Sequence, residues 1–409
     1  MKLRESTLML AMLFLSLVPL NAEQFHAIVP LPADLQGEMD GVSYRISVPV
    51  NWNGTLLVYT HGYNEGTTPP SLAPLPADAV TLSSLGYALA ASRFAGSGWN
   101  VKEGMQNTIA LTAAFRDMVG HPRRTIIWGR SMGGLMALEM IEKFPGIYDG
   151  AVALCPPAAG APRRFDQALD IALAYAVAFG WRSGWGTPGD LRDDLNFVND
   201  VLPDIGDHIA QIGGWEFIRR VNKIPPDTYY NSSNRVIPIY FATAVRAELE
   251  SRAGGPVAEN IGREYTLTEE DQLALAALGV DGYTLLAEMN AMTNISSLRN
   301  ARNYVEHYVN PAGRIKRPVL TLHTEGDALA TPNNEGAYRD TVEQQGNGDL
   351  LMQEFVLGGA HCTFTTQQDI AAIDAMMYWL DTGTRPDPSS FFPPAIGFDP
   401  DYVPEAWPW

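Results

Sequence analysis

Residues 129–133 read Gly-Arg-Ser-Met-Gly, a G-x-S-x-G sequence between the apolar run RTIIW (124–128) and the helix-like run LMALEMIEKF (135–144). This order predicts a strand, a sharp turn and a helix, with Ser131 at the turn. Such a turn lifts the hydroxyl off the sheet, and the two glycines leave room where the backbone segments cross. Five residues can match by chance, so the flanking runs are what make Ser131 the candidate nucleophile.

Strand-like and helix-like segments alternate around this motif. Helical spacing covers residues 107–120, with Asn107 as a candidate cap, and residues 131–144. The strand-like segments are residues 42–49, 56–59, 86–94, 125–129 and 151–155. The alternation predicts an α/β fold, with a mostly parallel sheet flanked by helices on both faces.

A long helical segment interrupts the alternation. Residues 158–312 read as mostly helical, and strand-like runs resume at residues 317–323 and 351–357. A segment of domain length between two strands is typical of an insertion into one domain. We therefore expect a discontinuous core of residues 23–157 and 313–409, covered by a helical cap, or lid, of residues 158–312.

The first 22 residues resemble a secretory signal peptide. Lys2 and Arg4 charge its start, residues 8–20 are largely apolar, and Ala22 stands at the expected cleavage point. That run is too short to span a bilayer, and no later stretch is apolar for long enough. We expect a secreted or periplasmic protein without a membrane span, whose two cysteines meet conditions in which a disulfide persists.

Composition excludes several classes of function. The chain is 46% hydrophobic over 409 residues, enough for a large core, and its formal net charge of −18 leaves no broad basic surface. Nucleic acids and anionic membranes are therefore poor partners. There is no P-loop and no His or Cys spacing typical of zinc, so we expect no cofactor and no metal.

A serine hydroxyl needs a base, and the base needs an acid that fixes its tautomer and stabilises its charge. Here the chain resembles the α/β-hydrolase superfamily, in which serine, acid and histidine follow in that order at the ends of strands. That order leaves His361, in the sequence Gly-Gly-Ala-His after strand 351–357, as the base for Ser131. The other six histidines precede the serine, lie in the insertion or, like His323, sit inside a strand.

The acid should follow the preceding strand, where two carboxylates compete. Asp327 and Glu325 both lie just after the strand-like run of residues 319–323. Glu325 is nearer to the strand, and acids of either type serve in the superfamily. The resemblance favours Asp327, which follows Gly326 in the loop.

The oxyanion formed on attack needs preorganised donors. The resemblance implies that one donor is the backbone N–H of Met132, directly after the nucleophile. The second should come from His61-Gly62-Tyr63-Asn64, which resembles the His-Gly segment of lipases and esterases, with Tyr63 as the donor. We expect His61 to brace this loop. The lipase segment often has three glycines and this chain has one, which leaves the second donor open.

Cys155 and Cys362 are expected at the same edge of the sheet, so a disulfide between them would tether the histidine loop. Tannase and fungal feruloyl esterases resemble the chain here, because they pair a cysteine after the histidine with one beside the serine. This chain departs from them by having Arg130 before Ser131. The alternative is two separate buried thiols.

These residues predict a secreted serine hydrolase that cleaves a small-molecule or oligomeric carboxylic ester through an acyl-enzyme. An exported aminopeptidase or prolyl-type peptidase with the same triad is the second reading. An acidic cluster from the cap facing Ser131 would favour a peptidase, and an apolar or aromatic cleft would favour an ester. A non-catalytic binding protein on this fold is the third hypothesis, and it would be expected to have lost a triad member.

Overall fold

The computed structural model describes residues 27–64, 75–226 and 233–408. The expected signal peptide, residues 1–22, lies outside these ranges. Within them, no helix combines the length and the apolar character needed to cross a membrane.

One eight-stranded sheet forms the centre of the described chain, in the order β1-β2-β4-β3-β5-β6-β9-β10. The first two pairings are antiparallel, and every pairing from β4 to β10 is parallel. The strands are β1 (Ala33–Met39), β2 (Val42–Val48), β3 (Thr55–Thr60), β4 (Ala88–Ser92), β5 (Arg124–Arg130), β6 (Gly150–Leu154), β9 (Val319–Thr324) and β10 (Leu351–Val356).

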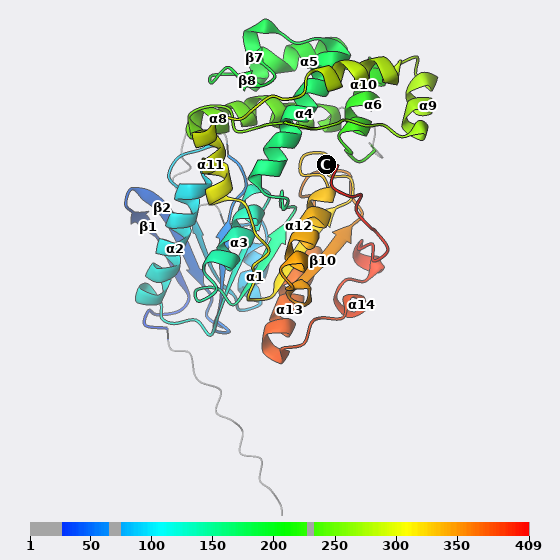
Figure 1. The fold of residues 1–409 in the computed structure, drawn as a ribbon. Coiled ribbons are helices and arrows are strands. Elements are labelled where there is room, and N and C mark those ends of the chain that lie inside the picture. The colour runs from blue at the N-terminus through cyan, green and yellow to red at the C-terminus, as the bar shows by residue number, and fades with distance from the viewer. Residues whose placement is uncertain (1–26, 65–74, 227–232, 409) are drawn as a thin grey trace, which may run out of the picture.

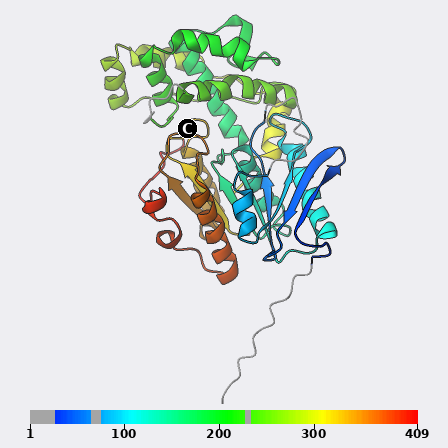
Figure 2. The same ribbon diagram turned by 180° about the vertical axis from the view of Figure 1, so that it is seen from behind.

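Helices cover both faces of the sheet, and each face has its own apolar core (Figures 1 and 2). Successive side chains of a strand point to opposite faces, so Leu56 and Val58 of β3 join one core while Leu57 and Tyr59 join the other. The first core packs against α2 (Val101–Met118), α3 (Met132–Lys143) and α12 (Asn333–Gln344), and the second packs against α1 (Ala79–Ser84) and α13 (Thr366–Thr382).

Two details differ from expectation. The structure adds β1, in which half-buried Ala33, Leu35 and Met39 alternate with exposed polar residues; this period of two and the Asp40-Gly41 turn, with both φ positive, were its local signals. Helix α2 begins at Val101 and not near Asn107, whose side chain accepts a hydrogen bond from Ala95 N–H instead of capping a helix.

Between β6 and β9 the chain forms a layer of helices over one end of the sheet (Figure 1). A two-stranded ribbon, β7 (Gly186–Thr187) and β8 (Asp190–Leu191), and single π-helical turns at Phe197–Val201 and Phe241–Val245 interrupt the layer. Its helices are α4 (Ala161–Phe179), α5 (Leu202–His208), α6 (Ile212–Val221), α7 (Ser233–Tyr240), α8 (Arg246–Ala253), α9 (Glu269–Ala277), α10 (Gly282–Ala291) and α11 (Arg299–Tyr308).

After α13 the chain runs back along the free edge of β10 as a strap that includes α14 (Pro388–Phe391). The strap pairs with β10 through two backbone hydrogen bonds, from Leu357 N–H to Gly397 O at 2.9 Å and from Asp399 N–H to Phe355 O at 3.0 Å. This pairing satisfies part of the outer edge of the sheet.

Candidate active site

Ser131 lies at the turn between β5 and α3. Its backbone φ of 55° and ψ of −124° fall in a region that residues other than glycine rarely adopt. Ser131 N–H donates to Leu154 O at 2.9 Å, and the Thr60 hydroxyl donates to the Gly133 carbonyl at 2.8 Å. A Cβ atom at Gly129 or Gly133 would collide with Thr60, so both positions require glycine. The turn therefore holds the serine at the carboxyl end of the sheet.

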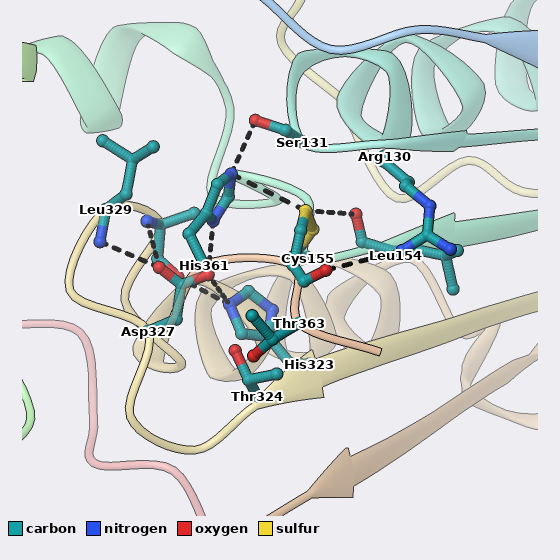
Figure 3. Close-up of a disulfide and its surroundings, with 12 residues drawn as sticks. Arg130, Ser131, Leu154, Cys155, His323, Thr324, Asp327, Leu329, His361 and Thr363 are labelled. Carbon is teal, nitrogen blue, oxygen red and sulfur yellow. Dashed lines mark hydrogen bonds and ion pairs between the residues drawn. A yellow bond between two sulfur atoms is a disulfide. The ribbon is translucent and has the colours of Figure 1, made fainter. Parts of the chain in front are cut away.

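The structure brings Ser131, His361 and Asp327 together (Figure 3). His361 Nε2 lies 2.8 Å from Ser131 Oγ, and His361 Nδ1 lies 2.6 Å from Asp327 Oδ2. The other carboxylate oxygen, Asp327 Oδ1, accepts from Leu329 N–H at 2.8 Å and from Ala330 N–H at 2.9 Å. The three side chains thus form a continuous hydrogen-bonded chain from a hydroxyl to a fixed carboxylate.

Asp327 is fully buried, yet its surroundings favour the ionised form. Burial alone would raise the pKa of Asp327, but the charge of His361 and hydrogen bonds from His323 and His361 hold it well below the ordinary value. An ionised Asp327 keeps the proton of His361 on Nδ1, so Nε2 faces the serine as an acceptor.

Glu325, the competing acid, lies outside this chain of contacts. Its backbone N–H donates to Val356 O, and its side chain faces Asp399 of the strap. Burial and the neighbouring Asp399 carboxyl raise the pKa of Glu325 to about 6.

His323, which the sequence placed inside a strand without a role, lies directly behind Asp327. Its Nε2 is 2.5 Å from Ala330 O and 3.4 Å from Asp327 Oδ2, and its Nδ1 is 2.9 Å from Glu335 Oε1. His323, Asp327 and Glu335 have no exposed surface. The local signal was the spacing of four residues between His323 and Asp327; the Glu335 contact depends on how α12 packs.

The two expected oxyanion donors lie on either side of the elbow. Met132 is the first residue of α3, where N–H groups have no carbonyl partner within the helix. Thr60 at the end of β3 pairs with Gly129 of β5, so the loop that carries Tyr63 starts beside the elbow. His61 braces that loop: Nδ1 is 2.7 Å from Gly62 O and Nε2 is 3.0 Å from Arg93 O.

Cys155 and Cys362 form a disulfide with a Cα–Cα distance of 5.4 Å. It joins the end of β6 to the residue after His361 across a sequence separation of 207. The sulfur and imidazole ligand atoms converge as they would around a metal ion, but a disulfide offers no thiolate ligand.

Arg130, where the chain departs from tannase, reaches the same loop. Its Nη1 lies 3.5 Å from Cys362 O, and its Nη2 contacts Asp369 of α13 and lies 3.1 Å from Asp78 Oδ2. Arg130 thus links the elbow to the histidine loop and to α13 by hydrogen bonds, while the disulfide ties that loop to the end of β6.

The helical layer contacts the site from the other side. Arg164 of α4 is buried, donates to Leu329 O in the acid loop, and stacks over Phe241 with Cζ 3.9 Å from the ring centre. A cavity of about 310 Å³ reaches the acid loop at Ala328. Its wall has an apolar part that includes Ile212, Trp215, Ile218, Ile224 and Pro238, and it also contains the charged residues Glu216, Arg219 and Arg235.

A second cavity of about 710 Å³ adjoins Tyr63 and has the acidic residues Asp193, Asp194 and Glu248 in its wall. The Glu248 carboxylate already accepts hydrogen bonds from Trp99 N–H and from Arg252. Asp194 is ion-paired with Arg192 at 2.6 Å.

A parallel sheet with a serine elbow after β5, an acid after β9 and a histidine after β10 decides the fold. The chain has the α/β-hydrolase fold. In this chain the sheet continues into an antiparallel hairpin at one edge and is covered by the inserted helices at its carboxyl end (Figure 1).

Comparison with known proteins gives distant relatives of this chain. No protein-family model matches the chain. An o-phthalyl amidase of Xanthobacter agilis is 26% identical over 430 residues, which cover 90% of this chain and 91% of the relative.

Solved structures with a similar arrangement include enzymes that act on different bonds. An esterase from Aspergillus oryzae has a TM-score of 0.48 at 14% identity, covering 86% of this chain and 80% of its own. A proline iminopeptidase from Mycobacterium smegmatis has a TM-score of 0.39 at 13% identity, covering 86% of this chain and 98% of its own. One fold hosts many reactions, so the bond that is cleaved must be argued from the site.

Proposed function

We propose that the chain is a serine hydrolase with Ser131 as nucleophile, His361 as general base and Asp327 as the acid that orients it. The observation that carries the proposal is the chain of contacts from Ser131 Oγ to His361 Nε2 at 2.8 Å and from His361 Nδ1 to Asp327 Oδ2 at 2.6 Å. A nucleophile and a base within hydrogen-bond reach, with the base oriented by a third group, are what acyl transfer to serine requires.

The reaction would run through an acyl-enzyme. Ser131 Oγ attacks the substrate carbonyl carbon while its proton passes to His361 Nε2, and the N–H groups of Met132 and Tyr63 hold the oxyanion. The tetrahedral intermediate collapses as His361 returns that proton to the leaving group. A water molecule, deprotonated by His361, then hydrolyses the acyl-Ser131 ester, and Asp327 stays ionised throughout.

A carboxylic ester is the first choice of substrate. The support is the apolar part of the wall of the cavity at Ala328, the residue after Asp327; Trp215 and three isoleucines form this part, beside the charged Glu216, Arg219 and Arg235. Such a wall suits the acyl or alcohol part of an uncharged ester. The helical insertion, residues 158–312, would then act as the cap that sets substrate size.

An amide of an aromatic acid is the second candidate, favoured by the full-length relative that is an o-phthalyl amidase. An aminopeptidase needs an anion to hold the substrate amine, and Glu248 in the acidic cavity is already engaged by Trp99 and Arg252. A non-catalytic role is least favoured, because all three triad positions are occupied and in contact.

We also propose that the protein is exported. The support is the signal-like pattern of the first 22 residues and the disulfide between Cys155 and Cys362. N-terminal sequencing of the protein from the culture or periplasm of an expression host should find the start near residue 23. A start at Met1, in protein found only inside the cell, would contradict export.

Labelling with a fluorophosphonate probe tests the proposed chemistry. The native protein should label on Ser131, the Ser131→Ala variant should not, and Ser389→Ala, the same change at an exposed serine, should label like the native protein. Labelling of folded Ser131→Ala, or none of the native protein, would overturn the proposal. Matched esters and amides of acetic, benzoic and phthalic acid then rank the two substrate classes.

A further inference from the structure

A second histidine contacts the buried face of the acid loop. His323, at the end of β9, lies between Glu335 of α12 and Asp327 and reaches the carbonyl of Ala330. We propose that His323 is a doubly protonated imidazolium, and that it positions Asp327 and offsets part of its charge. The positioning role rests on the proposed function, whereas the protonation state does not.

The first argument is that both ring nitrogens of His323 face oxygen acceptors. Nδ1 is 2.9 Å from Glu335 Oε1, while Nε2 is 2.5 Å from Ala330 O and 3.4 Å from Asp327 Oδ2. A neutral imidazole has one N–H and one lone pair, so one nitrogen would direct its lone pair at an oxygen. Two protons on the ring satisfy all of these contacts.

The second argument is charge balance. Glu335 Oε2 accepts from Thr321 Oγ1 at 2.7 Å and from Gln353 Nε2 at 2.6 Å, while Oε1 faces His323, so every neighbour treats Glu335 as an acceptor. A carboxylate with no exposed surface requires a positive partner nearby. His323 is the cation in direct contact with it.

The charged groups around the ring agree with this assignment. Burial lowers the pKa of a histidine, but hydrogen bonds to Asp327 and Glu335 and their negative charges outweigh burial and raise the pKa of His323 to about 10. Arg164 of α4 and His361 are the other cationic or titratable groups near Asp327.

His61 provides a contrast within the same molecule. Both of its ring nitrogens also face oxygens, but these belong to the neutral carbonyls of Gly62 and Arg93. Within the described residues, neither ring nitrogen of His61 contacts a carboxylate, and burial lowers the pKa of His61. The carboxylates that contact His323 therefore distinguish it from His61.

The position of His323 fixes the acid in two ways. It shares Asp327 Oδ2 with His361 and also holds the Ala330 carbonyl, while Leu329 and Ala330 N–H groups hold Asp327 Oδ1. Its positive charge also weakens the field of Asp327 at His361. Without that charge, His361 would retain its proton to a higher pH.

Nitrogen-15 NMR of histidine-labelled protein tests the protonation state without reference to activity. The signals absent from His323→Gln identify His323, and in the native protein both nitrogens should stay in the protonated range up to about pH 9, where unperturbed histidines are neutral. Loss of one proton near pH 6–7 would overturn the imidazolium. If His323→Gln does not fold, Glu335→Gln should make the same signals titrate at lower pH, and an unchanged titration would overturn the charge argument.

The positioning role is tested by the pH dependence of kcat/KM, with the fluorophosphonate labelling rate as a second readout. We expect His323→Gln to lower kcat/KM about tenfold and to move the acid limb about one unit to higher pH. The double variant His323→Gln/Glu335→Gln removes both charges, so its acid limb should return most of the way to the native pH. His121→Gln, at an exposed histidine, should change neither quantity. Lower activity in His323→Gln without a shifted limb would reduce His323 to a packing role, whereas a native protein that never labels would refute the serine mechanism and leave the NMR result standing.

Discussion

The core and the helical insertion bury charge in different places. In the core, the buried His323 and Asp327 and the half-buried Arg130 lie at or just after the carboxyl ends of strands, beside the candidate site. In the insertion, they join separate segments: Asp170 of α4 contacts Arg263 in the segment before α9, and Asp166 of α4 pairs with Arg302 of α11 at 2.6 Å.

This difference separates two ways of using buried charge. Backbone ladders and apolar side chains hold the core together, so its charges can serve the site. Among the described residues of the insertion, the short β7–β8 ribbon is the one sheet, and ion pairs such as Asp170–Arg263 join segments that are distant in sequence. We therefore expect core charges to govern chemistry and insertion charges to govern stability.

The sharpest test exchanges the two competing acids of the core for amides. Asp327→Asn should lower kcat about 10⁴-fold, because an amide stabilises the wrong tautomer of His361 and cannot balance its charge. Glu325→Gln, the same change two residues away, should leave kcat within about a factor of three, as its side chain faces Asp399. The larger loss in Glu325→Gln would make Glu325 the triad acid.

In the insertion, Arg263→Met should mainly affect stability. The change leaves Asp170 buried without its guanidinium partner, so we expect the free energy of unfolding to fall by about 4 kcal/mol. Arg299→Met, the same change at an exposed arginine of α11, should cost less than about 0.5 kcal/mol. Urea unfolding measures both. Equal losses of unfolding free energy in the two variants would show that the Arg263–Asp170 pair does not stabilise the insertion.

Removing the disulfide should cost somewhat less. Cys155→Ala/Cys362→Ala releases the histidine loop from β6, and we expect about 3 kcal/mol less stability, with faster amide hydrogen exchange around residues 357–365. Reductant should weaken the native protein and leave the double variant unchanged. Unaltered exchange in the loop would mean that Arg130 and the strap hold it without the covalent link.

The smallest effect concerns pH. Burial and the adjacent Asp78 carboxyl raise the pKa of Asp369 to about 8, although Arg130 opposes the shift. Between about pH 4 and 8 the folded state keeps a proton that the unfolded chain has lost, so stability should fall as pH rises through this window.

In Asp369→Asn, the decrease in the free energy of unfolding between about pH 4 and 8 should be smaller by about 2 kcal/mol. Asp117→Asn, on the exposed side of α2, should keep the native slope. If Asp369→Asn keeps the native dependence of unfolding free energy on pH, another group holds the retained proton.

Much of the α/β fold and the order of the candidate site residues could be predicted from sequence, because each of those features is local. The elbow shows itself in Gly129, Ser131 and Gly133 between an apolar run and a helical one, and Asp327 and His361 each follow a recognisable strand. The order of these residues along the chain is then enough to group them, without any measured distance.

What escaped prediction depends on contacts between distant segments. The Glu335 partner of His323 comes from the packing of α12 against β9 and β10, and Asp170 meets Arg263 across 93 residues. Strand β1 is an exception, because its signal was local: Ala33, Leu35 and Met39 alternate with polar residues and pack on the core. The roles assigned to Tyr63 and Met132 remain predictions.

The strap along β10 has a consequence for how the protein meets other chains. An open sheet edge is a row of unused backbone donors and acceptors on which a foreign strand can add. Phe398 forms an antiparallel bridge with Val356, and the Tyr402 ring packs 4.9 Å from that of Phe355. The C-terminal segment thus pairs with part of the β10 edge and blocks the addition of a strand from another chain there.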